Sequence, residues 1–218
     1  MSCCEKHGHD HNQEVDLVPT IQIGKQIPSF DIEVYDPASY GFETVSLQEL
    51  RTLQKWVVLF FYPADFTFVC PTELADLAEQ HETLSGMGVE IVSMSTDTKF
   101  AHMAWRQSEQ LLSGVTFKMG ADPTGEISRH FGIYDEETGL AARGTFIICP
   151  KGNLVGSEIN YDNVGRNAAE LVRKLKAFVY LQQHPEQVCP AKWVEGDKTL
   201  TPSADIVGNV YGALNSVR

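Results

Sequence analysis

The sequence has no long hydrophobic run. A membrane-spanning helix needs about 20 consecutive apolar residues, whereas the longest apolar stretch, from Trp56 to Tyr62, has the length of a strand. The first residues, Met-Ser-Cys-Cys-Glu-Lys-His, lack the apolar core of a secretory signal. We therefore expect no membrane segment and a protein that stays in the cytoplasm, where it is made.

Basic residues are scarce. The 218 residues include 17 Lys and Arg against 29 Asp and Glu, so the formal net charge is −12 and the pI is about 4.9. A surface of this sign repels phosphate backbones, so we expect no nucleic-acid partner. With 43% hydrophobic residues, the chain can bury one full core rather than two equal ones.

Cysteine is also sparse, with five residues at positions 3, 4, 70, 149 and 189. An odd and scattered count does not suit the disulfide framework of a secreted protein. No Cys-x-x-Cys pair is present, which argues against a dithiol–disulfide oxidoreductase of the thioredoxin type. In a reducing compartment, each cysteine is instead a small apolar residue, a metal ligand or a reactive thiol.

The chain divides into three parts. Residues 1–20 form a polar tail without hydrophobic periodicity, residues 21–183 form the folded domain, and residues 184–218 form a proline-containing arm. The tail carries two thiols and three imidazoles that could bind Zn²⁺, Ni²⁺ or Cu⁺. Such close spacing on a tail more often gives adventitious binding, so we assign no metal site and leave open whether the tail binds metal. These residues are Cys3, Cys4, His7, His9 and His11.

Strand-like and helix-like patterns alternate within the domain. The expected strands are 29–35, 56–62, 89–95, 115–119 and a hairpin of 144–149 with 154–159. The expected helices are 71–84, 98–112, a short one at 127–131 and a long one after residue 165. This order predicts an α/β fold with a central mixed sheet and helices on both faces, as in thioredoxin-like folds.

One segment combines several features of a reactive cysteine. In Phe60-Phe-Tyr-Pro-Ala-Asp-Phe-Thr-Phe-Val-Cys-Pro-Thr-Glu73, a buried strand and a short loop lead to Cys70. Pro71 is suited to the first position of the following helix because it lacks the amide hydrogen that would go unpaired. Cys70 therefore lies at or near the helix N-cap. There, free amides and the helix dipole favour a thiolate, the nucleophilic form of cysteine.

Two residues of the same loop would assist that thiolate. Thr67 has a hydroxyl that can donate a hydrogen bond to a bound oxygen or accept one from it. Pro63 can shield the sulfur without offering it an amide hydrogen. A lone Cys-Pro pair would also suit an inert cysteine at a strand–helix junction, but the full pattern Pro-x-x-x-Thr-x-x-Cys-Pro is specific and favours catalysis.

This pattern resembles the signature of the peroxiredoxins. The chain looks most like the typical two-cysteine kind represented by the bacterial alkyl hydroperoxide reductase C subunit, and the likeness runs from about residue 21 to 207. Other segments that look like that subunit are Asp122-Pro-Thr-Gly125, Gly139-Leu-Ala-Ala-Arg-Gly-Thr-Phe146, Gly165-Arg166 and His184-Pro-Glu-Gln-Val-Cys-Pro-Ala-Lys-Trp193.

The resemblance implies a thiol-dependent peroxidase that reduces hydrogen peroxide and organic hydroperoxides without a cofactor. Cys70 would attack the terminal peroxide oxygen, release water or an alcohol and become a sulfenic acid. Arg143 would lie beside the thiolate and stabilise the moving charge, with Glu73 and Arg166 orienting it. From the residues alone, Arg143 would be a strand-edge cation, and Glu73 with Arg166 a surface salt bridge.

A second Val-Cys-Pro triplet contains Cys189. A sulfenic acid needs a partner thiol, and Cys189 in the proline-flanked arm suits that role. The resemblance implies that it belongs to the other subunit of a head-to-tail homodimer, with a disulfide between subunits, and that five dimers form a decameric ring. The alternative is a buried spacer. Cys149, at the end of an apolar strand, is expected to be a core residue.

A non-enzymatic holdase or redox-sensing scaffold on the same fold also stays open at this level. The physiological reductant is not deducible from the sequence, since thioredoxin or a flavoprotein disulfide reductase would serve equally. The preferred hydroperoxide is not deducible either.

Overall fold

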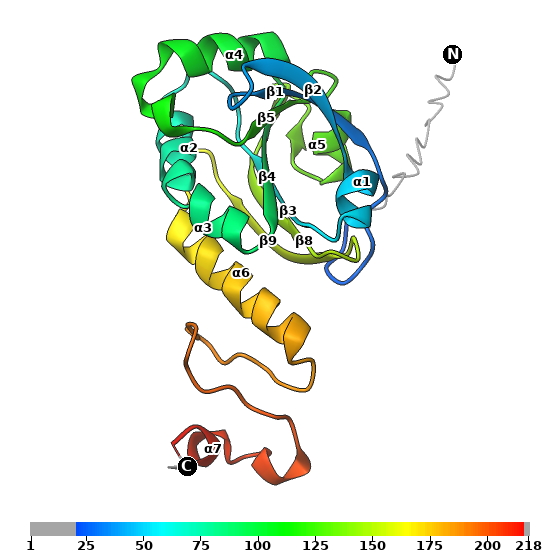
Figure 1. Ribbon diagram of the computed structural model, residues 1–218, viewed down its shortest axis with the longest axis vertical. Coiled ribbons are helices and arrows are strands. Elements are labelled where there is room, and N and C mark those ends of the chain that lie inside the picture. The colour runs from blue at the N-terminus through cyan, green and yellow to red at the C-terminus, as the bar shows by residue number, and fades with distance from the viewer. Residues whose placement is uncertain (1–20, 216–218) are drawn as a thin grey trace, which may run out of the picture.

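The computed structural model describes residues 21–215 as an α/β fold built on one large mixed sheet (Figure 1). Seven strands lie in the order β2-β1-β5-β4-β3-β8-β9. The pairs β3–β4 and β4–β5 are parallel and the others are antiparallel. The strands are β1 (Asp31–Asp36), β2 (Gly41–Ser46), β3 (Trp56–Phe61), β4 (Val89–Ser95), β5 (Lys118–Ala121), β8 (Arg143–Ile148) and β9 (Leu154–Asn160). A small separate sheet pairs β6 (Tyr134–Asp135) with β7 (Leu140–Ala141).

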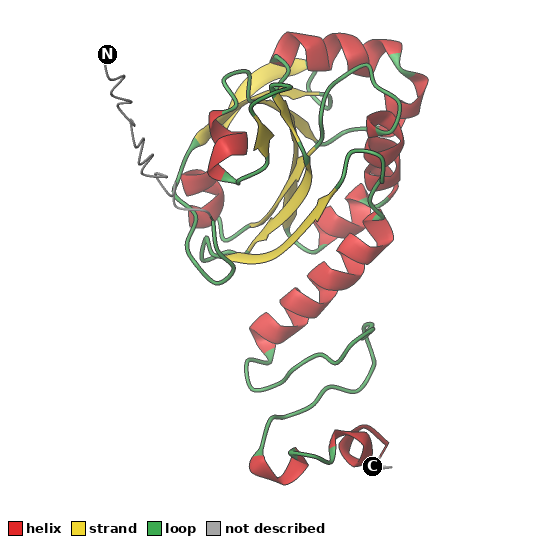
Figure 2. Ribbon diagram, turned by 180° about the vertical axis from the view of Figure 1, so that it is seen from behind, coloured by secondary structure: helices red, strands yellow, loops and turns green. Residues whose placement is uncertain are grey.

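Helices cover both faces of the sheet (Figures 1 and 2). On one side lie α2 (Cys70–Glu79), α3 (His81–Gly86) and α6 (Ala168–Gln183), and on the other α1 (Leu47–Thr52) and α5 (Glu126–His130). The remaining helices are α4 (Lys99–Ser108), α7 (Val210–Asn215) and the 3₁₀ turns η1 (Gln110–Gly114) and η2 (Ala204–Ile206). Within residues 21–215, none of the helices has the length and apolar character needed to cross a bilayer.

The central strand β3 shows why the sheet is covered twice. All six of its residues are buried, and successive side chains point to opposite faces. Trp56, Val58 and Phe60 join the apolar layer beneath α2 and α6, whereas Val57, Leu59 and Phe61 join the layer beneath α1. The continuous apolar run in the sequence is therefore the mark of a strand buried on both sides, as predicted.

The predicted strands at 29–35, 56–62 and 89–95 and the predicted hairpin are confirmed within one or two residues at each end. Three boundaries were wrong. The single helix expected at 71–84 is two helices that meet at Gln80. The next residue, His81, contacts Thr116, with 2.8 Å between Nδ1 and Oγ1, and packs on Phe117. The helix expected at 98–112 ends at Ser108. The strand expected at 115–119 begins at Lys118, where pairing with β4 starts. The sequence analysis did not predict β2 or α1.

After α6, the chain continues as an arm that extends away from the sheet (Figures 1 and 2). A bridge between Val188 and Leu200 closes a loop in this arm, and Trp193, only 2% exposed, packs against Tyr180 of α6. Farther along, Val207 and Tyr211 are more than four-fifths exposed. The division of the chain at residues 183 and 184 stays a prediction.

Candidate active site

Cys70 is the first residue of α2, and Pro71 is the second. The carbonyl of Val69 accepts hydrogen bonds from the amides of Thr72, at 3.0 Å, and Glu73, at 3.2 Å, so the helix begins sharply at the cysteine. The Cys70 side chain is fully buried. Its sulfur therefore lies at the positive end of the helix and away from bulk water.

The register of the sheet brings Arg143 to this cysteine. Phe61, the last residue of β3, pairs with Gly144, so Arg143 stands where the loop to Cys70 leaves the strand. Its Nη1 lies 3.4 Å from the Cys70 Sγ, and its Nε donates to the Asp162 carbonyl at 2.8 Å. At 4% exposed, Arg143 is not the surface cation that its sequence position alone would favour.

Glu73 connects this arginine to a second one. Its Oε2 accepts from Arg143 Nη1 at 2.7 Å and from Arg166 Nη2 at 3.0 Å. Its Oε1 accepts from Arg166 Nε and from the Arg166 amide, both at 2.8 Å. Arg166 also donates to Thr145 and lies over the ring of Phe60, with 3.5 Å from its guanidinium carbon to the ring centroid. The predicted pair is therefore a buried network rather than a surface salt bridge.

Interactions within this network shift the pKa values of its members. Burial alone would raise the pKa of Glu73, but the hydrogen bonds and charges of Arg166 and Arg143 outweigh it and hold that pKa below its usual value. Burial lowers the pKa of Arg166 despite Glu73. For Arg143, burial is opposed by the Cys70 sulfur and by Glu73, which together raise its pKa.

The loop between β3 and α2 holds the other two predicted residues. Thr67 is half-buried and donates its hydroxyl hydrogen to the Ala64 carbonyl at 2.9 Å, so its oxygen is left as an acceptor. Pro63 is buried in the same loop. Sequence reasoning missed Asp65 and His102, which form a buried contact beside Pro63. The one signal for them was a histidine three residues before the buried Trp105 on α4.

The remaining cysteines lie elsewhere. Cys189 is half-buried in the arm, and burial raises its pKa while Arg173 lowers it in part. Cys149 follows β8 and packs against the core, yet it keeps some exposure, so the prediction of a core residue was only partly right. Cys70, Cys149 and Cys189 are all free thiols. The tail residues from Cys3 to His11 lie outside the described residues, and within 21–215 no group of three or more His, Cys, Asp or Glu side chains could hold a metal.

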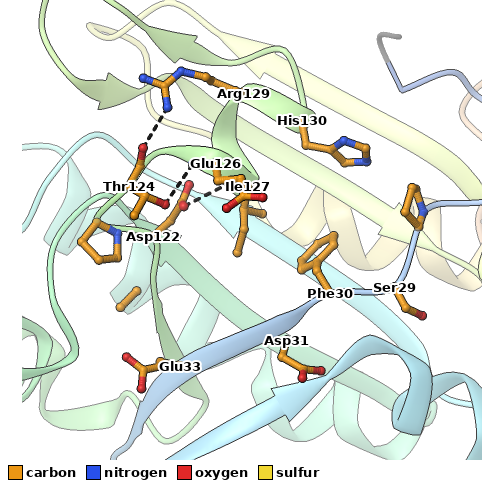
Figure 3. A pocket seen from close by; sticks show the side chains of 13 residues that line it. Ser29, Phe30, Asp31, Glu33, Asp122, Thr124, Glu126, Ile127, Arg129 and His130 are labelled. Carbon is orange, nitrogen blue, oxygen red and sulfur yellow. Dashed lines mark hydrogen bonds between the residues drawn. The ribbon is translucent and has the colours of Figure 1, made fainter. Parts of the chain in front are cut away.

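A cavity of about 520 Å³ lies between the start of β1, the residues that follow β5, and α5 (Figure 3). Phe30 and Ile127 line it together with the carboxylates of Asp31, Glu33 and Glu126. None of the predicted site residues contributes to it. The candidate active site is therefore the buried network around Cys70 and not this cavity.

The model of the AhpC/TSA family matches residues 23–157, which is more than half of the chain. The chain belongs to the AhpC/TSA family. A second model, described as the C-terminal domain of 1-Cys peroxiredoxin, matches residues 177–210, where this chain carries Cys189. The alkyl hydroperoxide reductase C of Staphylococcus haemolyticus (strain JCSC1435) is 48% identical over 188 residues, or 86% of this chain and 98% of that relative.

Solved structures agree with this assignment. Enterococcus faecalis AhpC superposes with a TM-score of 0.73 at 40% identity, covering 78% of this chain and 100% of that one. The reduced 2-Cys peroxiredoxin of Plasmodium vivax gives a TM-score of 0.79 at 27% identity, covering 85% and 98%. The family resemblance, the thioredoxin-like fold and the enzyme class are thereby confirmed. The protein is a thiol-dependent peroxidase.

Proposed function

We propose that Cys70 is the residue that reduces the peroxide, with Arg143 as its charge partner. The observation that carries this is the charge balance of the buried network. Two guanidinium groups, Arg143 and Arg166, face one carboxylate, Glu73, so one positive charge is left over. The Cys70 sulfur at 3.4 Å from Arg143 Nη1 neutralises it as a thiolate.

The chemistry follows from this arrangement. The Cys70 thiolate attacks the terminal oxygen of ROOH, an S–O bond forms as the O–O bond breaks, and the departing RO⁻ takes up a proton to leave as ROH. Negative charge moves from sulfur onto the leaving oxygen, and Arg143 stays within reach of both. The Thr67 oxygen, whose own hydrogen goes to the Ala64 carbonyl, accepts the hydrogen of the peroxide in this proposal. Pro63 has no amide hydrogen, so its backbone cannot donate a hydrogen bond to the sulfur.

The resulting sulfenic acid is resolved by Cys189 of a partner subunit. Helix α6 begins next to α2, where the Ala168 amide donates to Asp76 at 2.7 Å. It then runs for 16 residues, about 24 Å at 1.5 Å per residue, away from Cys70. The arm then turns back along the helix, where Arg173 donates to the Trp193 carbonyl at 2.8 Å and lowers the pKa of Cys189 in part. Within one chain, Cys70 and Cys189 are both free thiols, and Cys70 is fully buried. Together with the likeness to a 2-Cys peroxiredoxin, this supports a thiol from a second subunit for the step.

The disulfide between Cys70 and the partner's Cys189 then takes two electrons and two protons from a dithiol donor. Thioredoxin or a flavoprotein disulfide reductase supplies them, and the head-to-tail dimer assembles further into a ring of five dimers. A reducing compartment, the cytoplasm, suits an enzyme that depends on free thiols. The exposed apolar side chains of the arm, including Val207 and Tyr211, support a partner surface at this end.

Rapid mixing of the reduced protein with hydrogen peroxide tests the assignment. Wild-type protein is expected to consume peroxide with second-order kinetics, and Cys70→Ser to abolish consumption while leaving the circular dichroism spectrum unchanged. Cys149→Ser is the matched control and should retain the wild-type rate. A Cys70→Ser protein that keeps even about a tenth of that rate, so that its activation barrier is only roughly 1.4 kcal/mol higher, would contradict the assignment of Cys70 as the nucleophile. A wild type that consumes none would favour a holdase or sensor instead.

A further inference from the structure

A second buried polar network lies at the start of the loop that carries Cys70. Asp65 is 7% exposed and His102 of α4 is fully buried, with 2.8 Å between Asp65 Oδ2 and His102 Nδ1. The other carboxylate oxygen of Asp65 accepts from the Tyr62 hydroxyl at 2.8 Å. The other ring nitrogen of His102 lies 3.0 Å from the Gly120 carbonyl in β5. This cluster joins the end of β3, the loop, α4 and β5.

The proton positions in this cluster are fixed by its partners. A carbonyl can only accept, so His102 Nε2 carries a hydrogen for Gly120. One proton then lies between His102 Nδ1 and Asp65 Oδ2, and the pair is neutral whichever atom holds it. Burial raises the pKa of Asp65 although His102 opposes that rise, which favours keeping the proton in the contact. Every polar atom of the pair thus has a partner, and His102 Nδ1 also lies 3.4 Å from the Tyr62 hydroxyl.

The same loop is also held by its backbone. The Asp65 amide donates to Asp97 Oδ2 at 2.8 Å, and the Ser95 hydroxyl donates to the same oxygen at 2.8 Å. Directly after Asp65, Phe66 has a φ of +57°, in the left-handed region that a non-glycine residue rarely adopts. Phe66 is 60% exposed, and its ring packs against Trp105 with 6.1 Å between the ring centroids. The hydrogen bonds to Asp65 therefore act together with the Thr67–Ala64 hydrogen bond to hold the strained turn that precedes Cys70.

We propose that Asp65 and His102 are positioning residues for the peroxide step. They hold the strained turn so that Thr67 and Cys70 keep the positions, relative to Arg143, from which all three contact the substrate. This inference rests on the proposed function of Cys70. It concerns geometry rather than charge, because neither residue contacts the Cys70 sulfur. A displacement of about 1 Å in a catalytic group can cost on the order of 10²-fold in rate. Without the Asp65–His102 contact, the turn relaxes and moves Thr67 and Cys70 away from these positions.

Two measurements on the full-length reduced protein separate positioning from a general loss of stability. The first is the second-order rate with hydrogen peroxide, which needs the complete site. The second is alkylation of Cys70 by iodoacetamide, followed by peptide mass spectrometry, which needs only an accessible sulfur. Since Cys70 is fully buried, a relaxed loop should slow the first reaction and speed the second.

The variants distinguish geometry from charge. Asp65→Ala removes the Asp65–His102 contact, and we expect a peroxide rate at least about tenfold lower together with faster alkylation. Asp65→Asn can keep all three hydrogen bonds, since its amide donates to a neutral His102 and its oxygen still accepts from Tyr62. We expect it to stay within about threefold of wild type. Should Asp65→Ala not fold, His102→Ala carries the same test, because it removes both ring nitrogens that contact Asp65 and the Gly120 carbonyl.

Asp122→Ala is the matched control. Asp122 is a buried carboxylate, 2% exposed, that accepts from the Ile127 and Ser128 amides and the Ser128 hydroxyl at the start of α5. Its loss should lower stability without changing the peroxide rate. Equal slowing by Asp65→Ala and Asp122→Ala, or an unchanged rate in Asp65→Ala with a reactive wild type, would overturn the inference alone. A wild type unreactive to peroxide would overturn the proposed function and this inference with it.

Discussion

The substitution Glu73→Gln tests whether the buried network holds the active site together. In the wild type, the Glu73 carboxylate accepts four hydrogen bonds of 2.7–3.0 Å from Arg143 and Arg166. Glutamine has nearly the same shape but no charge, and its NH₂ group would face guanidinium donors. The change therefore leaves two buried cations with only the Cys70 thiolate to balance them, and at least one N–H without an acceptor.

The expected loss of stability is large for a change of one atom. Removing one partner of a buried ion pair typically costs about 3–5 kcal/mol, because the remaining charge stays buried without compensation. Glu73 is 3% exposed and Arg143 is 4% exposed, so water can do little to solvate the charges that remain. An exposed ion pair is worth no more than about 1 kcal/mol.

Urea denaturation of the reduced proteins at pH 7, at one fixed protein concentration, measures the difference. Glu136→Gln is the control, since Glu136 also binds an arginine with both oxygens, at 2.6 and 2.9 Å to Arg129, but is 68% exposed. We expect this control to match the wild type within the error of the measurement. A Glu73→Gln protein that loses less than about 1 kcal/mol, the range of exposed pairs, would refute the reasoning.

The same variant has a pH signature. The folded-state pKa of Glu73 lies below its unfolded value, so its contribution to stability is fully present above the ordinary glutamate pKa of about 4.3 and is lost as the pH falls through the folded-state pKa. The difference in unfolding free energy between wild type and Glu73→Gln should therefore be constant from pH 8 to about 5 and shrink below about pH 4. A difference that grows on acidification would contradict the assignment of the shift to Glu73.

Three further predictions concern catalysis and assembly. Arg143→Ala should slow the peroxide step by about 10²-fold, the cost of losing one preorganised charged donor; a wild-type rate in stopped-flow kinetics would return Arg143 to a structural role. Peroxide-treated wild type should run as a disulfide-linked dimer on a non-reducing gel, whereas Cys189→Ser should run as a monomer yet consume the first equivalent of peroxide at the normal rate. Mass spectrometry that joins Cys70 to Cys149 would move the resolving role to that thiol. Light scattering of the reduced protein should give a mass far above the 24.2 kDa of one chain, and a stable monomer would exclude the dimer and the ring.

The local parts of the site could be predicted from the sequence. The run from Trp56 to Tyr62 is apolar at every position, so it indicates a strand covered on both faces. The Cys-Pro pair indicates a helix start, because proline suits the first helical turn. The helix does begin there, with Cys70 as its first residue. These features depend on neighbours within a few positions, so the sequence carries them directly.

Boundaries set by distant contacts were the ones that failed. The break between α2 and α3 occurs where His81 reaches Thr116 and Phe117, and periodicity cannot register a contact 35 positions away. Strand β2 was missed because it is an edge strand with three exposed residues in succession, from Phe42 to Thr44. Its sequence therefore lacks the alternation that marks a half-buried strand.

The active site itself was decided by the tertiary structure. Residue types alone left Arg143 as a surface cation, and only the resemblance to a known family moved it toward Cys70. The pairing of Phe61 with Gly144 brings it there across 73 positions of sequence. The contact between Asp65 and His102, which spans 37 positions, had no equivalent signal. Sequence thus determined which residues can react and where the helix presents the thiol. Sheet register and helix packing decided which charges surround it, because a charge acts through distance in space and not through distance along the chain.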